Sequence, residues 1–176
     1  GTIKNDNGIN FEVSRIGGNL NATATAGNIT DTTTGALEVE GTSTLVTTAN
    51  DASITLDQGG HSFTGKLLIT TTDNETGINN DSDVTISAGS GAALVFGTST
   101  IKGDLSVMTS NTTGIADTDS EILTIHGTAS FQTVTDGADI VLDAGHEITG
   151  KVTLNTTGSG GSDATLDNRA LDIVLG

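Results

Sequence analysis

The sequence predicts an all-β fold, a parallel β-helix (β-solenoid) with three short strands per coil, in which residues 1–176 form a single domain. Three observations predict it: an internal duplication, a shorter glycine spacing inside each copy, and short segments that alternate apolar and polar residues. The apolar residues are mostly Val, Ile, Leu and Ala, with 4 Phe, no Trp and no Tyr. Such small side chains suit a narrow interior between closely stacked strands.

The duplication has an offset of about 85 or 86 residues and divides the chain into repeats at approximately 9–93 and 94–176. Ile9 and Phe11 of the first copy correspond to Leu94 and Phe96 of the second. Longer matching segments follow in the same order in both copies: 16–20 with 101–105, 36–42 with 122–128, 54–57 with 140–143, and 61–66 with 146–151.

Each repeat divides again into intervals of about 23 or 24 residues. Glycines mark these intervals in both copies: Gly18, Gly41 and Gly65, then Gly103, Gly127 and Gly150. Three short alternating pieces fall within one interval, for example 20–22, 28–30 and 37–39. Three strands per interval make one coil, so we expect about three coils per repeat and six to seven in all. An antiparallel β-sandwich is the alternative fold, but it needs no such sub-repeat.

The charge excludes several kinds of partner. The formal net charge is −16, from 22 Asp and Glu against 6 Lys and Arg. Nucleic-acid binding and attraction to an anionic membrane surface both require clustered basic residues. No stretch is long and apolar enough to insert into a membrane, and the absence of Cys excludes disulfides and thiolate metal sites.

Several segments resemble the repeats of filamentous-haemagglutinin-type adhesins, which are giant bacterial surface proteins. The resemblance is carried by residues 18–20, 26–30, 35–42, 52–57 and 63–67. It implies a right-handed parallel β-helix that is extracellular or held at the cell surface and is used in attachment. It implies no catalytic residues. We therefore expect a non-enzymatic structural shaft that spaces or displays adhesive regions, with neighbouring repeats or subunits end to end and a cell-surface receptor or glycan as partner.

Three other functions stay open. The chain could be a subunit that assembles into an extracellular filament by end-to-end stacking, since solenoid ends expose unpaired strand edges. It could be a calcium-dependent or carbohydrate-binding module. A polysaccharide-degrading β-helix enzyme is the least favoured, because such enzymes use aromatic platforms for sugar rings and the chain has neither Trp nor Tyr.

The acidic segment 73–83 is the candidate metal site, and calcium is the one cofactor that the sequence suggests. Its carboxylates belong to Asp73, Glu75, Asp81 and Asp83, and Ca²⁺ prefers several oxygen ligands. The spacing matches neither an EF-hand nor the nonapeptide calcium repeat, so a solvated turn is the alternative.

Two further patterns favour structural roles. His61 and His146 occupy equivalent positions in the two copies, which favours a role in a turn over catalysis. Thr-x-Thr pairs would form an ice-binding face only if they aligned from coil to coil. The pairs fall at different places within their coils, so the sequence predicts no long array of aligned Thr-x-Thr pairs: Thr23 and Thr25, Thr42 and Thr44, Thr98 and Thr100.

Overall fold

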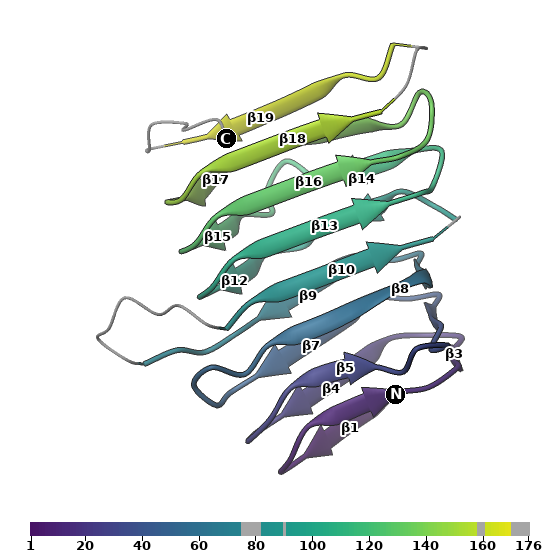
Figure 1. Cartoon of the computed structure of the whole chain (residues 1–176), viewed down its shortest axis with the longest axis vertical. Coiled ribbons are helices and arrows are strands. Elements are labelled where there is room, and N and C mark those ends of the chain that lie inside the picture. Colours follow the sequence, from purple (N-terminus) through teal and green to yellow (C-terminus); the bar gives the residue numbers. More distant parts are fainter. Residues whose placement is uncertain (75–81, 90, 158–160, 170–176) are drawn as a thin grey trace.

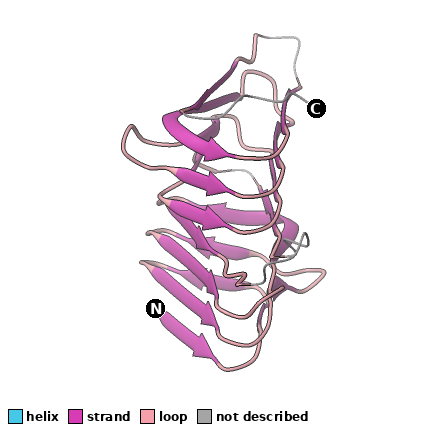
Figure 2. Ribbon diagram, turned by 90° about the vertical axis from the view of Figure 1, so that its left-hand side faces the viewer, coloured by secondary structure: helices cyan, strands magenta, loops and turns pink. Residues whose placement is uncertain are grey.

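The computed structural model describes residues 1–74, 82–89, 91–157 and 161–169. They form a parallel β-solenoid of about seven turns, as predicted, with the N-terminus at one end of the stack (Figures 1 and 2). All the strand pairs described are parallel. The described residues contain no helix, and hence none that could cross a lipid bilayer.

Each coil has three sides, and strands of successive coils stack on each side. Two strands pass round a corner and serve two sides each, β8 (Ile54–Phe63) and β17 (Asp139–Ile148). Side 1 contains β1 (Thr2–Asn5), β4 (Leu20–Ala24), β7 (Ser43–Thr47), β9 (Leu67–Thr70), β12 (Ser99–Ile101), β15 (Leu123–Ile125) and the end of β17. Side 2 contains β2 (Ile9–Phe11), β5 (Ile29–Asp31), the start of β8, β10 (Val84–Ala88), β13 (Leu105–Thr109), β16 (Ala129–Thr133) and β18 (Val152–Thr156).

Side 3 consists of two shorter ladders, one above the other. The lower ladder contains β3 (Ser14–Ile16), β6 (Leu37–Val39) and the end of β8. The upper ladder contains β11 (Leu94–Val95), β14 (Gly114–Ala116), the start of β17 and β19 (Ala164–Asn168). The residues that lead into β11 lie over the end of β8, since the amide of Gly89 donates to the carbonyl of His61 at 2.7 Å.

The core is a single slim interior lined by ladders of apolar side chains. One ladder on side 2 runs through all seven coils, and none of its members is more than 7% exposed: Ile9, Ile29, Ile54, Val84, Leu105, Ala129 and Val152. Fully burying a Val, Leu or Ile side chain stabilises a fold by about 1.5–3 kcal/mol. Stability is therefore distributed along the stack.

Leu20, Leu45 and Leu67 lie on the consecutive strands β4, β7 and β9, as the predicted coils require. They do not form one ladder, however. The register places Ser43 between Leu20 and Leu67, while Leu45 pairs with Ile69 on the next inward ladder. Leu45 is displaced by two residues from the position that would align it with Leu20 and Leu67. Because side chains alternate between the two faces of a strand, such a displacement leaves Leu45 facing the core.

The two repeats are rotated relative to each other by one side of the coil. Counted from the first strand, and not from Ile9, one repeat is β1 to β9 and the next is β10 to β18. Strands β1 to β9 make ten sides, because β8 counts twice, and β10 to β18 also make ten because of β17. Ten sides are three coils and a third, so each strand of the first repeat has its counterpart one side further round. β4 on side 1 thus corresponds to β13 on side 2.

The landmark glycines show the same rotation. In the first repeat they lie between sides 3 and 1, and in the second between sides 1 and 2. They stack directly on one another: a Cβ added to Gly65 would come within 2.5 Å of the backbone of Gly41, and one added to Gly150 within 2.3 Å of that of Gly127. The spacing in the sequence therefore marks a corner where successive coils approach too closely for a side chain.

Candidate functional site

A buried histidine–aspartate pair joins two coils of the first repeat. His61 lies where β8 turns the corner and is fully buried. Its Nδ1 accepts a hydrogen bond from the amide of Leu37 at 2.9 Å, and its Nε2 lies 2.7 Å from Oδ2 of Asp31 on the coil below. Because Nδ1 accepts an N–H, we assign the proton to Nε2, which donates it to the carboxylate. The same Asp31 oxygen accepts the amide of Gln58 at 3.1 Å.

The second repeat contains the same arrangement. Nδ1 of His146 accepts the amide of Leu123 at 3.0 Å, and its Nε2 lies 2.8 Å from Oδ2 of Asp117. This second contact is a close electrostatic one without the angles of a hydrogen bond. Burial lowers the pKa of His146 below its usual value of 6.5, and the nearby carboxylates, chiefly that of Asp117, oppose this shift only in part. The neutral imidazole is therefore the form that the fold stabilises.

These pairs link coils, and their burial keeps them from solvent. Both imidazoles are 0% exposed, and their carboxylate partners are 3% and 1% exposed. A general base must reach a proton on its substrate, which neither ring can do in this conformation. The corner position agrees with the structural role expected of the histidines. The aspartate partners were not anticipated, although Asp31 and Asp117 are separated by the repeat offset.

The proposed calcium ligands lie only partly within the described residues. Glu75 and Asp81 fall outside them. Oδ1 of Asp83 accepts the backbone amide of Asp104 at 2.7 Å, and Asp73 also has an interaction partner. Among the residues that the structure describes, no three His, Cys, Asp or Glu side chains gather in a group that could hold a metal ion. Calcium binding therefore stays a prediction.

Corner Asn and Asp side chains link successive coils elsewhere along the chain. In each case a side-chain oxygen accepts a backbone amide of the next coil, which continues the ladder where the strands stop. Six such links between described residues have donor–acceptor distances of 2.6–3.1 Å: Asn19–Thr42, Asn28–Ser53, Asn50–Asn74, Asp83–Asp104, Asp104–Thr128 and Asp139–Asp163. Part of the acidic composition thus has a structural use.

Side 2 also carries a hydroxyl ladder that the sequence did not predict. Its members are register partners from the second coil to the seventh and point away from the core: Thr30, Thr55, Thr85, Ser106, Ser130 and Thr153. It is a single column of hydroxyls and not an array of aligned Thr-x-Thr pairs: the register partner of Thr23 is Val46, and that of Thr44 is Asn21. The corners vary in length, so residues that align in space are not evenly spaced in the sequence.

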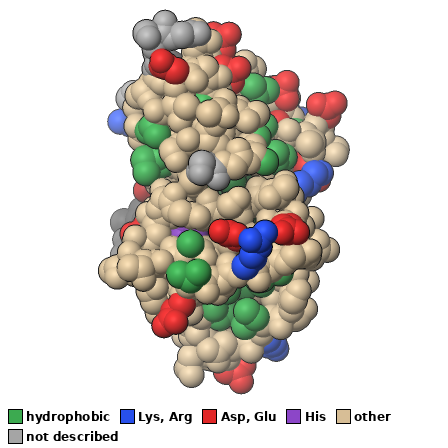
Figure 3. Space-filling view, turned by 90° about the vertical axis from the view of Figure 1, so that its right-hand side faces the viewer, with side chains coloured by type: hydrophobic (Ala, Val, Ile, Leu, Met, Phe, Trp, Pro, Cys, Tyr) green, Lys and Arg blue, Asp and Glu red, His purple; other side chains and the backbone are tan. Residues whose placement is uncertain are grey.

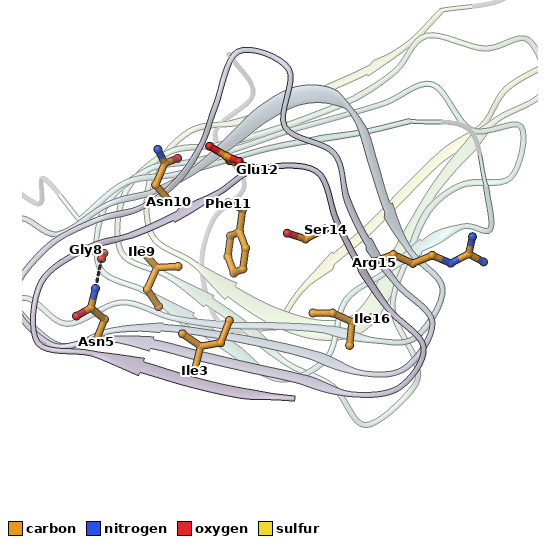
Figure 4. A pocket seen from close by; sticks show the side chains of 10 residues that line it. All are labelled: Ile3, Asn5, Gly8, Ile9, Asn10, Phe11, Glu12, Ser14, Arg15 and Ile16. Carbon is orange, nitrogen blue, oxygen red and sulfur yellow. Dashed lines mark hydrogen bonds between the residues drawn. The ribbon is translucent and has the colours of Figure 1, made fainter.

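The first coil has one uncovered edge. Among the described strands, β1, β2 and β3 each pair on one side only, with β4, β5 and β6. A concavity of about 610 Å³ opens there, lined entirely by residues of this coil. Ile3, Ile9, Phe11 and Ile16 point into it, whereas Arg15 points outward from the corner (Figure 4). The edge therefore combines free backbone groups with an apolar centre.

A family model matches the chain twice, over residues 1–70 and 81–155, and its description is repeats of unknown function (DUF5649). The chain belongs to this family. Neither the curated proteins nor the solved structures contain a match. The match supports a repeat protein, and the likeness to filamentous-haemagglutinin-type adhesins stays a prediction.

The two DUF5649 matches agree with the division into ten sides. One match begins at β1 and ends at β9, and the other begins shortly before β10 and ends within β18. β19 then takes the place that β1 and β10 hold in their repeats. It ends at Asn168, which pairs with His146 as Ala88 pairs with His61.

Proposed function

We propose that the chain is a segment of a non-enzymatic extracellular shaft, built from DUF5649 repeats, that spaces or displays adhesive regions at a cell surface. The observation that carries this proposal is the continuous stacking of seven coils along one axis, with the same ladder of apolar residues running from Ile9 to Val152. Such a stack has a fixed length per repeat, because each repeat contacts only its neighbours along the axis.

The surface supports a spacer. Most of the face in Figure 3 consists of neutral polar side chains and backbone, with acidic side chains at several heights. The exposed large hydrophobic residues of the described chain are few: Ile3, Val13, Met108, Val134 and Val141. A net charge of −16 favours solubility and discourages lateral association. These are properties expected of a solvated rod.

The length of one coil gives a direct test on cells of the source organism. Deleting residues 88–108 joins Ser87 to Thr109, which follows the register partner of Ser87, so the deletion removes one coil, keeps the sides in order and leaves both His–Asp pairs in place. We expect the shortened protein to stay folded. Protease added to intact cells should cleave it, because the shaft lies outside the cell. Attachment should weaken only if it depends on the length of the shaft. As a control, deleting residues 88–98 removes one side, that of β11, and should unfold the repeat.

Two results would contradict the proposal. One is protection of the segment from added protease on intact cells when lysis exposes it. The other is an enzymatic activity on a polysaccharide that the purified chain retains and that a single substitution abolishes.

A further inference from the structure

The apolar residues at the uncovered edge have counterparts inside the stack. Ile9, Phe11 and Ile16 of the first repeat correspond to Leu94, Phe96 and Ile101 of the second. The first two are 7% and 5% exposed, and Ile16 is only partly buried. The counterparts are 1%, 0% and 0% exposed. Ile9 and Phe11 are thus slightly more exposed than their counterparts, and Ile16 is clearly more exposed than Ile101.

The last coil of the first repeat closes these positions in the second. Phe96 forms a bridge with Leu67, and the amide of Gly97 donates to the carbonyl of Leu67 at 2.9 Å. Thr100 pairs with Thr70, whose neighbour Thr71 donates its amide to the carbonyl of Thr100 at 2.9 Å. This junction joins two repeats by the same parallel ladder that joins coils within one.

The C-terminal coil carries the other half of this junction. Val152 and Leu154 correspond to Leu67 and Ile69, which are fully buried. Leu154 is only partly buried, and β18 pairs with β16 alone among the described strands. An apolar edge that fits the first coil is thus present at the opposite end of the same chain.

We propose that the uncovered edge of the first coil is a docking surface for the last coil of another DUF5649 repeat, supplied upstream in the same polypeptide, and that each added repeat is turned by a third of a turn. This inference rests on the proposed shaft. Because a repeat has ten sides on a three-sided coil, equivalent side chains appear on all three sides in succession. They return to the same side after three repeats, about 48 Å along the axis at about 4.8 Å per coil.

The rotation determines how the shaft presents a binding group. If repeats contained a whole number of coils, one side would carry all copies of a given residue. With ten sides per repeat, the copies of a side chain in three successive repeats point in three different directions around the axis. A shaft of this kind presents equivalent sites to partners on every side.

A spliced array tests the docking register. β19 and β1 hold the same place in their repeats and both end in Asn, so residues 1–168 can be followed directly by residues 6–176. In the array, Arg15 of the appended copy should lie over Asn155, as Thr100 lies over Thr70. Neighbouring coils are about 4.8 Å apart, which suits a disulfide between Arg15→Cys and Asn155→Cys. The chain has no Cys of its own.

The matched control moves one cysteine by a single coil. Glu38 is the register partner of Arg15, so Glu38→Cys of the appended copy lies about 9.6 Å from Asn155→Cys and should stay reduced. We expect near-complete oxidation of the first pair within the monomer and little of the second. Scattering should show one rod of about twice the length.

The outcomes separate the inference from the proposed shaft. A single long rod in which the Arg15→Cys and Asn155→Cys pair stays reduced would overturn the docking register and leave the shaft standing. Two independently tumbling rods would contradict the shaft itself. A third outcome is end-to-end growth of the unmodified chain as its concentration rises. That result would show that a separate chain binds the uncovered edge of the first coil, and it would overturn the upstream repeat as the binding partner.

Discussion

The carboxylate of Glu121 lies 2.5 Å from the ammonium group of Lys66, although the two residues precede strands β15 and β9, which lie two coils apart. Thr98, on the coil between them, donates its amide and its hydroxyl to the same carboxylate at 2.7 and 2.6 Å. The hydrogen bonds from Lys66 and Thr98 lower the pKa of Glu121 to about 2, from 4.5. One side chain thus holds three coils together near the junction of the two repeats.

Glu121→Gln should destabilise the fold by about 1–2 kcal/mol at pH 7, because hydrogen bonds to a charged group are worth more than neutral ones. The folded-state pKa is below the unfolded value, so this stability is present above pH 4.5 and is lost as the pH falls towards about 2. Urea unfolding at several pH values measures it. Glu38→Gln, whose ion pair with Arg15 is exposed, is the control and should cost less than about 0.5 kcal/mol. Equal losses for the two variants would show that Glu121 does not link the coils.

His61→Ala and His146→Ala should each destabilise the fold by about 2–3 kcal/mol, because each removes the neutral imidazole that contacts a buried carboxylate and leaves a cavity in its place. His126 provides the control, since it is exposed and His126→Ala should cost less than about 0.5 kcal/mol. Chemical denaturation of the three variants measures the differences. If the three substitutions had the same small effect, the buried pairs would have no part in joining the coils.

The lowered pKa of His146 predicts how stability depends on pH. A histidine whose folded-state pKa lies below 6.5 binds fewer protons in the folded than in the unfolded state at weakly acidic pH. Stability should therefore fall as the pH is lowered from about 6.5 to about 5, with the carboxylates of Asp117, Asp143 and Asp167 limiting the loss. In His146→Gln the slope over this range should be smaller. A wild-type free energy of unfolding that stays constant or rises on acidification to pH 5 would contradict this account.

Gly65→Ala should destabilise the fold by about 2–3 kcal/mol, because a Cβ there would come within 2.5 Å of the backbone of Gly41 and would push the two coils apart. Gly18 belongs to the same corner of the lowest coil, and a Cβ added there would meet nothing within 4 Å. Gly18→Ala should change stability by less than about 0.5 kcal/mol. Thermal melting of both variants measures the difference, and similar melting temperatures would refute the close approach of the coils.

The coil could be predicted from the sequence because its cause is local. Four of the landmark glycines leave no room for a Cβ against the coil directly below, so close packing in space leaves a regular spacing in the chain: Gly41, Gly65, Gly127 and Gly150. The alternation of apolar and polar residues is local in the same way. It identified short strands with Leu20, Leu45 and Leu67 facing inward on successive coils.

The relationships between coils could not be predicted, because corners of different length hide the register. Ser43 rather than Leu45 lies between Leu20 and Leu67. The hydroxyl ladder likewise depends on the register between coils, which the sequence does not give. The rotation of the repeats could not be predicted for another reason. β8 and β17 pass round a corner without a break, so the number of strands in a repeat is smaller than the number of sides. The calcium prediction stays open because Glu75 and Asp81 lie outside the described residues. Asp83 accepts a backbone amide, which an acidic cluster in a sequence does not reveal.

The most direct test of the stacked coils is a distance measured between spin labels at Thr30→Cys and Thr153→Cys. Both positions belong to the hydroxyl ladder and lie five coils apart on the same side. At about 4.8 Å per coil, their backbones should be about 24 Å apart, and Thr55→Cys with Thr153→Cys should give about 19 Å. Two narrow distributions that differ by about one coil would support the solenoid. Equal distances for the two pairs, or a longer distance for the pair that is closer along the ladder, would contradict it.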